Sequence, residues 1–296
     1  MQTYRRVADV ENRGHHVHLH YGSLAELVRD AAGTTRGGMR PDTSSRASRE
    51  FSPRGDHRGT TTWEEALALA RDGWPEGAKR IVQLSDRLQD KLQTAMAERP
   101  GLELTEQGEE LDVAAWLGGS PEPWWTWTDE GGRSPVVSLG MNGAMNAHTS
   151  ADAFTTRGAM LLAVADALEA TGRRVALTMT WASDGEGWQT RTDVSVTLKR
   201  PDEQLDLQAL VFATANAAMF RRLVFSLREL LPKAMREGMR VPGSYGRSSD
   251  NAERVQGLDG ERPDVVIPSG THLRSADQAY DHALEVLREC GVDIDE

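Results

Sequence analysis

The chain has 296 residues, of which 39% are hydrophobic and 27% charged, and it carries a formal net charge of −11 with a single cysteine. One cysteine excludes an intrachain disulfide, and no run of residues approaches the ~18 uninterrupted apolar residues of a membrane span. The first residues lack the apolar core of a secretion signal. We therefore expect a cytoplasmic protein of one large or two small domains that does not contact a membrane.

The charge is unevenly distributed along the chain. Residues 1–60 hold ten Lys and Arg against seven Asp and Glu, whereas residues 61–132 hold six against fifteen and residues 133–296 hold eighteen against twenty-three. An acidic bulk argues against a large nucleic-acid groove, because phosphates need neutralising cations. The arginine-bearing arm of residues 29–58 is a candidate for nucleic-acid contact, and a solvated tail is the alternative interpretation.

Residues 14–21 alternate as a β-strand does, with His16, His18 and His20 on one face. Three imidazoles on one face could bind a metal ion, but they would lie ~7 Å apart along the strand, which is wide for one tetrahedral ion. A half-buried edge strand is therefore the favoured interpretation. A short capped helix follows this strand, and the two elements together make up an N-terminal unit of residues 1–32.

Residues 33–60 are rich in Gly, Ser, Thr and Arg and have almost no apolar anchors, which is the composition of a flexible linker. Order returns in residues 61–132, where Thr62 and Glu65 form a capping box before an apolar helical stripe that ends at Gly73. A second amphipathic helix follows after a turn. Because that helix has no concentrated basic face, a plain helical hairpin is favoured over a DNA-binding helix-turn-helix.

The segment 110–133 is predicted to be a short helix and a loop, and it is rich in tryptophan. Aromatic side chains in such density either seal two subdomains against each other or form an exposed surface for a partner protein. A seal is the favoured interpretation, and a partner surface is the leading functional alternative. The four tryptophans concerned are Trp116, Trp124, Trp125 and Trp127.

Residues 133–296 show the alternation of strands and helices that is typical of an α/β domain. A strand, a helix with an apolar stripe and a second strand form a βαβ unit, so the two strands should be parallel with a right-handed crossover. The next strand follows after a short turn, which makes it antiparallel and places it at a sheet edge. Two helices, a last short strand and a closing helix complete a mixed, mostly parallel sheet flanked by helices. These elements are predicted, in chain order, at residues 135–140, 155–172, 173–182, 192–200, 206–216, 218–231, 263–270 and 275–290.

This order of elements resembles part of a von Willebrand factor A-like domain over residues 134–294, and the helix "RGAMLLAVADALEATGRRV" is similar to one in chelatase-type and phage members of that fold. The whole chain is also similar to uncharacterised proteins encoded by actinobacterial phages and prophages, which share the look of "TTWEEALALARDGWPEG" and "DVAAWLGGSPEPW". The resemblance implies a phage or mobile-element origin, and a place in the host-cell cytoplasm or in association with the virion.

The von Willebrand A-like fold binds Mg²⁺ through an Asp-x-Ser-x-Ser motif after its first strand. In this chain Gly140 stands at the aspartate position, and Asn142 and Ala144 stand at the serine positions. The resemblance therefore implies a domain without its metal, because the anionic ligand is missing.

The same stretch could still bind a polar ligand or a partner. Its polar residues cluster at the carboxyl end of a strand and just before a helix N-terminus, where anions and ligands bind in open α/β sheets. The alternative is that these residues serve only as helix caps and turn residues. The residues of this edge are Asn142, Asn146, His148, Thr149 and Ser150.

The common catalytic motifs are absent from the sequence: it has no P-loop, dinucleotide fingerprint, nucleophile elbow or paired zinc-binding cysteines. We expect no cofactor and no metal, and we assign no catalytic residue. The leading hypothesis is a protein-interaction or structural protein that acts through residues 116–127 or 140–150. The alternatives are a nucleic-acid-associated factor that uses residues 29–58 and a carboxylate-metal-dependent hydrolase or nuclease.

Overall fold

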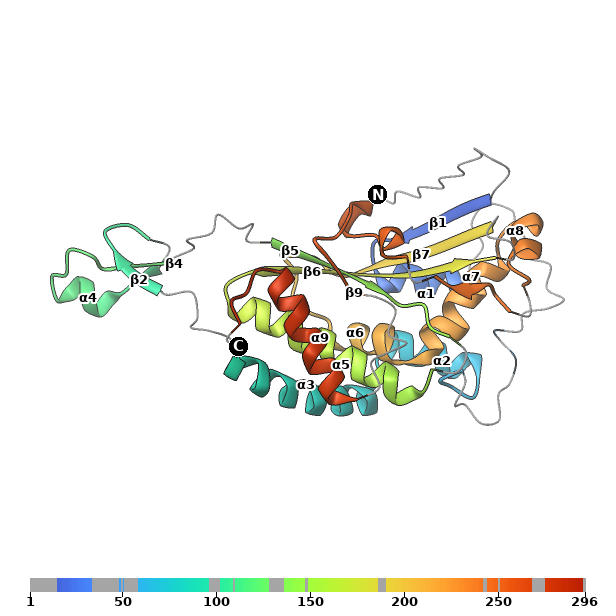
Figure 1. The fold of residues 1–296 in the computed structure, drawn as a ribbon, viewed down its shortest axis with the longest axis horizontal. Helices are drawn as coiled ribbons and strands as arrows, with labels where there is room; N and C mark the ends of the chain where they lie inside the picture. The colour runs from blue at the N-terminus through green and yellow to red at the C-terminus, as the bar shows by residue number, and fades with distance from the viewer. Residues whose placement is uncertain are drawn as a thin grey trace.

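Figure 1 shows the computed structural model of the chain, an α/β body with a small second sheet at one end. The body contains a six-stranded mixed sheet covered by helices, which confirms the predicted fold class. The structure describes residues 15–33, 48, 50, 58–95, 102–108, 110–127, 136–146, 149–185, 190–241, 244–249, 251–267 and 275–294.

The central sheet has the strand order β1 (His15–Tyr21), β7 (Thr190–Lys199), β6 (Arg174–Asp184), β5 (Val136–Asn142) and β9 (Val265–Ile267), with β8 (Arg247–Ser248) paired to β6 beside this path. Strand β5 pairs in parallel with β6 and with β9, whereas β6 and β7 form an antiparallel hairpin. Helix α5 (Ala151–Ala170) connects β5 to β6. The predicted βαβ unit and the antiparallel strand after it are therefore confirmed.

The position of β7 differs from the prediction that this strand lies at a sheet edge. Strand β1 pairs in parallel with β7, from His15 opposite Thr190 to Tyr21 opposite Val196, so β7 is an inner strand. The prediction is wrong because the neighbour of β7 comes from the distant N-terminal end of the chain, and local patterning does not report such pairing. The expectation that the histidine-bearing strand forms a sheet edge is confirmed.

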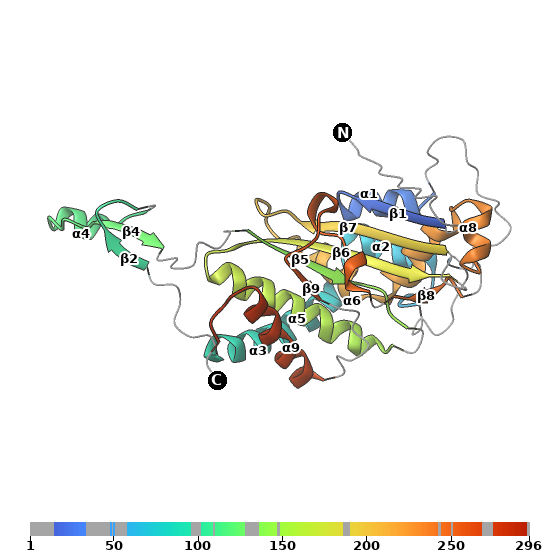
Figure 2. The ribbon, with the colours of Figure 1, turned by 45° about the horizontal axis from the view of Figure 1, so that its top comes forward.

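Successive side chains of a strand point to opposite faces of the sheet, and apolar and polar residues alternate along these strands, so one face of the sheet is apolar. The apolar row near its middle consists of Met141, Met179, Val196 and Tyr21. This face packs against the helices into one hydrophobic core, and Figures 1 and 2 show the long helices on the same side of the sheet. Besides α5, the α-helices of the body are α1 (Leu24–Ala31), α2 (Trp63–Asp72), α3 (Pro75–Ala95), α6 (Leu207–Ala215), α7 (Phe225–Glu229), α8 (Lys233–Gly238) and α9 (Ala276–Glu289).

The helix starts follow local capping signals. The Oγ1 atom of Thr62 accepts a hydrogen bond from the Glu65 amide and the Glu65 side chain accepts one from the Thr62 amide, so the predicted capping box of α2 is confirmed. Side chains of Ser23, Asp206 and Ser275 cap α1, α6 and α9 in the same position. Such caps satisfy amide groups that a helix leaves without partners.

The sequence predicts one helix over residues 218–231, and the structure divides it. Met219–Val224 forms a π-helix (η3), which passes directly into α7. The π-helix places Arg221 and Arg222 in the interior, where both are buried. The periodicity of apolar residues does not distinguish a short π-helix from an α-helix, so this feature could not be predicted from the pattern.

Residues 102–108 and 110–127 form a separate small unit around a three-stranded sheet, which we call the Trp module. Its elements are β2 (Leu102–Thr105), β3 (Glu110–Leu111), α4 (Val113–Leu117) and β4 (Trp124–Trp127), with β4 between β2 and β3. The predicted short helix is confirmed as α4. The predicted loop is wrong for β4, since these residues pair with both neighbours in a sheet, where aromatic side chains are favoured.

Within the described part of the chain, no single helix is long and apolar enough to cross a membrane. Helices Leu207–Ala215 and Met219–Glu229 meet the length and composition only when taken together, and they are bent by 73° relative to each other.

Candidate functional site

The face of the central sheet that is turned away from the helices is polar. Its side chains lie in rows across the strands, because paired residues of neighbouring strands point to the same side. The three rows are Asn142, Thr180, Ser195 and His20, then Ala182, Asp193 and His18, then Asp184, Arg191 and His16.

Arg254, at the end of the short 3-10 helix η4 (Ala252–Arg254), is the cation at the centre of this face. Its Nη2 atom lies 2.5 Å from Asp193 Oδ1, and its Nη1 atom lies 2.5 Å from Asp184 Oδ1. It also donates to the Ser183 carbonyl at 3.0 Å. Both carboxylate side chains are only 4% exposed, so one guanidinium pairs with two buried carboxylates.

Three histidines of β1, His16, His18 and His20, contact side chains of β7. His16 Nε2 lies 2.7 Å from Asp193 Oδ2, and the Oγ atom of Ser195 lies 2.6 Å from His18 Nε2 and 3.0 Å from His20 Nδ1. Among the described residues, no group of three or more His, Cys, Asp or Glu is placed to hold a metal ion. The alternative in which the imidazoles converge on one ion therefore finds no support in the arrangement of β1.

Burial and charge act in opposite directions on this network. Burial alone would raise the pKa of Asp193, but the hydrogen bond from His16 and the positive charge of Arg254 outweigh it, so the pKa is lowered. Burial lowers the pKa of His18 to about 4 against the opposing charge of Asp193. His18 is consequently neutral at pH 7, while Asp193 is ionised.

Residues 249 and 251–256, which we call the strap, lie across the polar face. The Nδ2 atom of Asn142 donates to the Ser249 carbonyl at 2.6 Å, and the Gln256 amide donates to Thr180 Oγ1 at 3.1 Å. Together with the contacts of Arg254, these bonds join the strap to side chains of β5, β6 and β7 on the polar face. This face therefore supports the strap.

Asn142, the first residue of the predicted ligand edge, is only 1% exposed. Its Oδ1 atom accepts from the Ala144 amide at 3.1 Å, and its carbonyl accepts from the Arg157 guanidinium. Arg157 is fully buried, and burial lowers its pKa to about 9. Every one of these contacts orders the turn after β5.

The other residues of the predicted edge also make contacts within the fold. Ser150 caps α5 by accepting from the Ala153 amide at 3.2 Å, and the Asn146 carbonyl accepts from Arg221 at 2.9 Å. The Thr149 amide donates to the same carbonyl at 3.1 Å. The predicted residue His148 lies outside the described residues. The structure thus brings the described members of the set together as cap and turn residues, and binding at this edge stays a prediction.

Gly140, which the predicted resemblance places at the aspartate position of a metal motif, lies where other side chains come close to the backbone. A Cβ atom at this position would lie 2.5 Å from Pro263 Cγ and 2.8 Å from Val255 Cγ1. A side chain of the strap and one of the segment after it therefore pack directly on the backbone of β5. A carboxylate at this position would have no room while those side chains stay in place.

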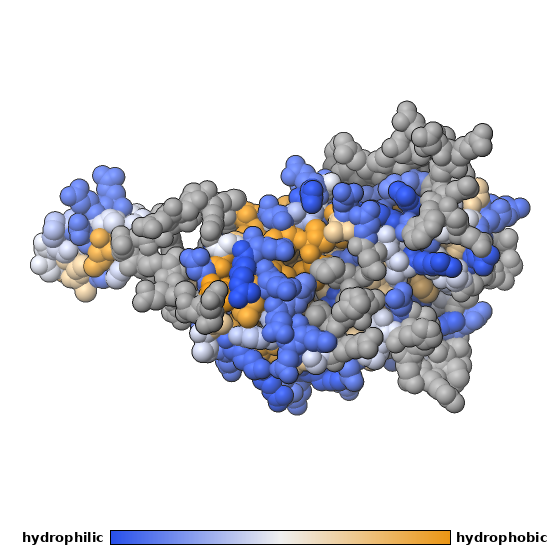
Figure 3. All heavy atoms as spheres, viewed as in Figure 1, coloured by the Kyte–Doolittle hydropathy of each residue, from blue (hydrophilic) through white to orange (hydrophobic). Residues whose placement is uncertain are grey.

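The tryptophans do not seal two subdomains in the views of Figures 1 and 2, where the Trp module stands apart from the body. Trp116 is 59% exposed, and Trp124 and Trp125 are half-buried within the module. The side chain of Trp127 lies outside the described residues. Figure 3 shows that the outer end of the module carries apolar as well as polar surface.

Arg222 holds the described residues of the predicted linker against the body. Its Nη1 and Nη2 atoms donate to four backbone carbonyls, at distances from 2.7 to 3.2 Å, and these belong to Ser48, Glu50, Thr60 and Thr61. Glu229 accepts from both the amide and the hydroxyl of Ser48. Most of the arm of residues 29–58 lies outside the described residues, so its contact with nucleic acid stays a prediction.

The sequence pattern does not predict the group formed by Arg254, Asp184 and Asp193. The one local signal is the alternation of Asp193, Ser195 and Thr197 with apolar residues along β7, which indicates a second, polar face. The partner cation comes from an irregular segment with no periodic pattern.

Comparison with known proteins assigns a family to the chain but no activity. The sequence model of a family described as a domain of unknown function, DUF7192, matches residues 5–294. No curated protein and no solved structure matches the chain.

Proposed function

We propose that this chain, which belongs to the DUF7192 family of domains of unknown function, is a protein-interaction protein that docks a second protein through its Trp module. A single observation carries the proposal. Among the described residues, the exposed large hydrophobic side chains are all on helix α4, where Val113 is 58%, Trp116 59% and Leu117 74% exposed.

These three side chains form one continuous surface. Residues at positions i, i+3 and i+4 lie on the same face of a helix, which is the spacing of Val113, Trp116 and Leu117. Exposed apolar patches of this kind mark protein interaction sites, and tryptophan is among the residues that contribute most binding energy there. The adjoining β4 contributes half-buried Trp124 and Trp125 to the same module.

The charge around the patch indicates the chemistry of the partner. Residues 102–127 contain six Asp and Glu and no Lys or Arg. Complementary surfaces pair opposite charges at the rim of an apolar contact. We therefore expect a partner protein that presents an apolar groove bordered by lysine and arginine.

The identity of the body as a metal-free von Willebrand A-like domain is part of the same proposal. It is supported by the order β5, α5, β6, β7, α6, β9 and α9, which is the predicted order of elements. It is further supported by the close packing of Pro263 on Gly140, which leaves no room for the metal-binding aspartate. The origin from a phage or mobile element, and a place in the cytoplasm or with the virion, rest on the sequence resemblance alone.

The test is site-specific photocrosslinking in a lysate of the cells that produce the protein. Benzoylphenylalanine replaces Trp116 in one preparation and Gln83, an exposed residue of α3, in the control. We expect a defined protein to crosslink at position 116 and not at position 83, and its crosslinked peptide to lie in an apolar surface bordered by basic residues. The yield should fall in about 0.5 M salt, because the charged rim is screened.

The captured partner is then purified and its affinity for the full chain is measured. Trp116→Ala should weaken binding by about 30-fold or more, since interface hot spots contribute about 2 kcal/mol or more. Gln83→Ala should leave the affinity unchanged. Crosslinking to a second copy of the chain, to nucleic acid, or equally from both positions would contradict the proposal.

A further inference from the structure

A cleft of about 560 Å³ opens where β1 and β7 end. Because these strands are parallel, their carboxyl ends at Tyr21 and Lys199 lie at the same edge of the sheet. Open α/β sheets bind ligands at the carboxyl ends of their parallel strands. Helices α1 and α6 both begin beside this cleft, with Ser23 and Asp206 as their caps. Its volume lies in the range of about 300–1,000 Å³ that is usual for small-molecule sites.

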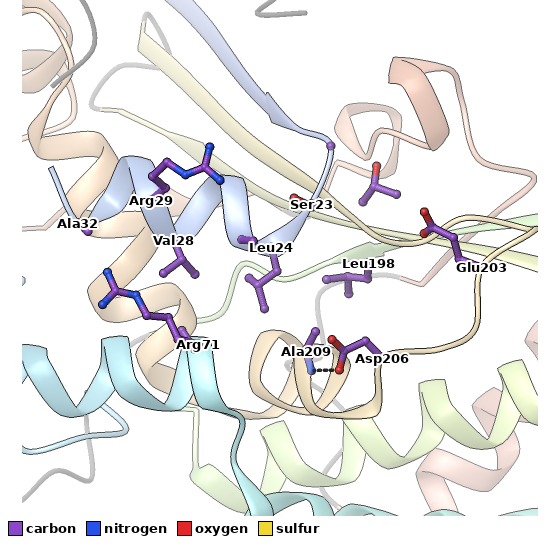
Figure 4. Close-up of a pocket in the computed structure, with 14 residues that line it drawn as sticks. Ser23, Leu24, Val28, Arg29, Ala32, Arg71, Leu198, Glu203, Asp206 and Ala209 are labelled. Atoms are coloured by element: carbon purple, nitrogen blue, oxygen red, sulfur yellow. Dashed lines mark hydrogen bonds between the residues drawn. The ribbon is translucent and has the colours of Figure 1, made fainter. Parts of the chain in front are cut away.

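The charged residues of the cleft are separated by sign. Figure 4 shows Arg29 and Arg71 toward one end of the cleft and Glu203 and Asp206 toward the other. The side chains between the two ends are apolar, and they include Leu24, Val28 and Leu198. The cleft therefore has a cationic end, an apolar middle and an anionic end.

Three charged groups of the cleft, Arg71, Glu203 and Asp206, retain capacity for a ligand. Asp206 uses Oδ1 to cap the Ala209 amide at 3.0 Å, and Glu203 uses Oε2 to accept from the Arg200 amide at 3.2 Å. The second oxygen of each carboxylate has no partner in the described part of the chain. Arg71 is exposed and makes no hydrogen bond or ion pair with a described residue.

We propose that this cleft binds a zwitterionic small molecule with an apolar centre, of the size and charge pattern of a short apolar peptide with free termini. The guanidinium of Arg71, with Arg29 at the same end, receives the ligand carboxylate, because guanidinium and carboxylate pair in a bidentate geometry. The ligand ammonium lies between Glu203 and Asp206. The apolar side chain of the ligand covers Leu198. This site is independent of the Trp module and of the function proposed above.

The experiment measures binding of the tripeptide Ala-Leu-Ala to the full chain by calorimetry at low salt. The comparison peptides are the same tripeptide with an acetylated N-terminus, the same tripeptide with an amidated C-terminus, and Ala-Asn-Ala. We expect each cap to weaken binding by about tenfold, since a hydrogen-bonded charge contributes about 1.5 kcal/mol or more. Replacing the central leucine by asparagine should also weaken binding, because the middle of the cleft is apolar.

Two variants assign the two ends of the ligand. Arg71→Gln should bind the free acid and the amide with equal affinity but still discriminate against the acetylated peptide. Glu203→Gln keeps the acceptor for the Arg200 amide. This variant should bind the free and the acetylated peptide with equal affinity but still discriminate against the amide. Asp206→Asn should act like Glu203→Gln, because asparagine caps a helix as well as aspartate does. Arg87→Gln, on the exposed surface of α3 away from the cleft, is the control and should bind as the unmodified chain does.

The crossed pattern of discrimination separates a binding site from a structural role, because loss of folding would weaken all four peptides together. Failure of Ala-Leu-Ala to bind at millimolar concentration would overturn the proposal. Equal affinity for the free and capped peptides, or unchanged discrimination in Arg71→Gln and Glu203→Gln, would overturn it as well.

Discussion

Replacing Arg254 by methionine tests whether charge holds the strap on the polar face of the sheet. Arg254 is 9% exposed and pairs with two carboxylates, Asp184 and Asp193, each at 2.5 Å. Removal of one partner of a buried ion pair costs about 3–5 kcal/mol, because an uncompensated charge stays buried. In the variant, Asp193 keeps His16 at 2.7 Å and Asp184 keeps the half-exposed Arg191 at 3.7 Å. We therefore expect the free energy of unfolding at pH 7 to fall by about 3 kcal/mol, at the lower end of this range.

The loss should depend on pH, with a sign fixed by Asp193. In the unmodified chain the pKa of Asp193 is lowered, so its contribution to stability is complete above the ordinary pKa of aspartate and is lost only as the pH falls below it, through the lowered folded pKa. Without the positive charge of Arg254, burial should raise the pKa of Asp193 in the folded variant. Its carboxyl should then take up a proton at a higher pH than in the unmodified chain. The stability curves of the two proteins should consequently converge between pH 7 and about pH 4.

Urea unfolding of both proteins at pH 7 and at about pH 4 measures these quantities. Arg247→Met removes an exposed arginine of β8 and should change stability by less than about 0.5 kcal/mol. The double variant Arg254→Met with Asp193→Asn should be more stable than the sum of the single changes predicts, since no unpaired charge remains at position 193. A loss below about 1 kcal/mol at pH 7, or an equal loss at both pH values, would refute the reasoning.

Three further predictions concern other parts of the same body. The folded pKa of His18 is about 4, so between about pH 6.5 and pH 4 the unfolded chain takes up a proton at His18 that the folded chain does not, and the unfolding free energy falls by up to about 1.4 kcal/mol per pH unit. His18→Gln should therefore flatten this decline. An unchanged slope in urea unfolding across this range would argue against the prediction. Arg222→Met should speed tryptic cleavage after Arg58 under native conditions, because the four backbone carbonyls that Arg222 contacts on either side of Arg58 lose their partner. A cleavage rate that changes only as much as global stability does would contradict a local role of Arg222. Gly140→Ala should lower the unfolding free energy by about 1–3 kcal/mol, because its Cβ would overlap Pro263. Gly22→Ala is the control, since its Cβ meets only an ordinary contact at 3.5 Å, with a side-chain oxygen of Glu26. Equal effects of the two changes would contradict the packing argument.

The parts of the fold that the sequence predicts are those that local physics determines. Thr62 and Glu65 are three residues apart, and their capping box forms within a single helical turn. The strand, helix and strand of the βαβ unit are likewise visible, because each element carries its own apolar period and the crossover rule leaves one arrangement for the pair.

The remainder depends on contacts between distant segments. The alternation of His16, His18 and His20 predicts a strand, but nothing in residues 14–21 specifies β7 as its partner. The role of Arg254 depends on two carboxylates that come from two other strands. The strand character of Trp124–Trp127 depends on β2 and β3, which are too short to show alternation of their own.

The same non-local pairing bears on where a ligand should bind. Strand β1 is parallel to β7 and β7 is antiparallel to β6, so the sheet has two carboxyl edges at opposite ends. The sequence pattern points only to the edge after β5, since β5 and β6 are the only parallel strands that it pairs. In the structure the strap crosses the polar face beside that edge, and the Ser249 carbonyl holds the side chain of Asn142. The edge after β1 and β7 instead opens into the cleft between α1 and α6. If the rule of carboxyl edges holds for this chain, a small ligand should bind beside Arg71 and Glu203, and substitutions at Asn146 or Thr149 should leave its affinity unchanged.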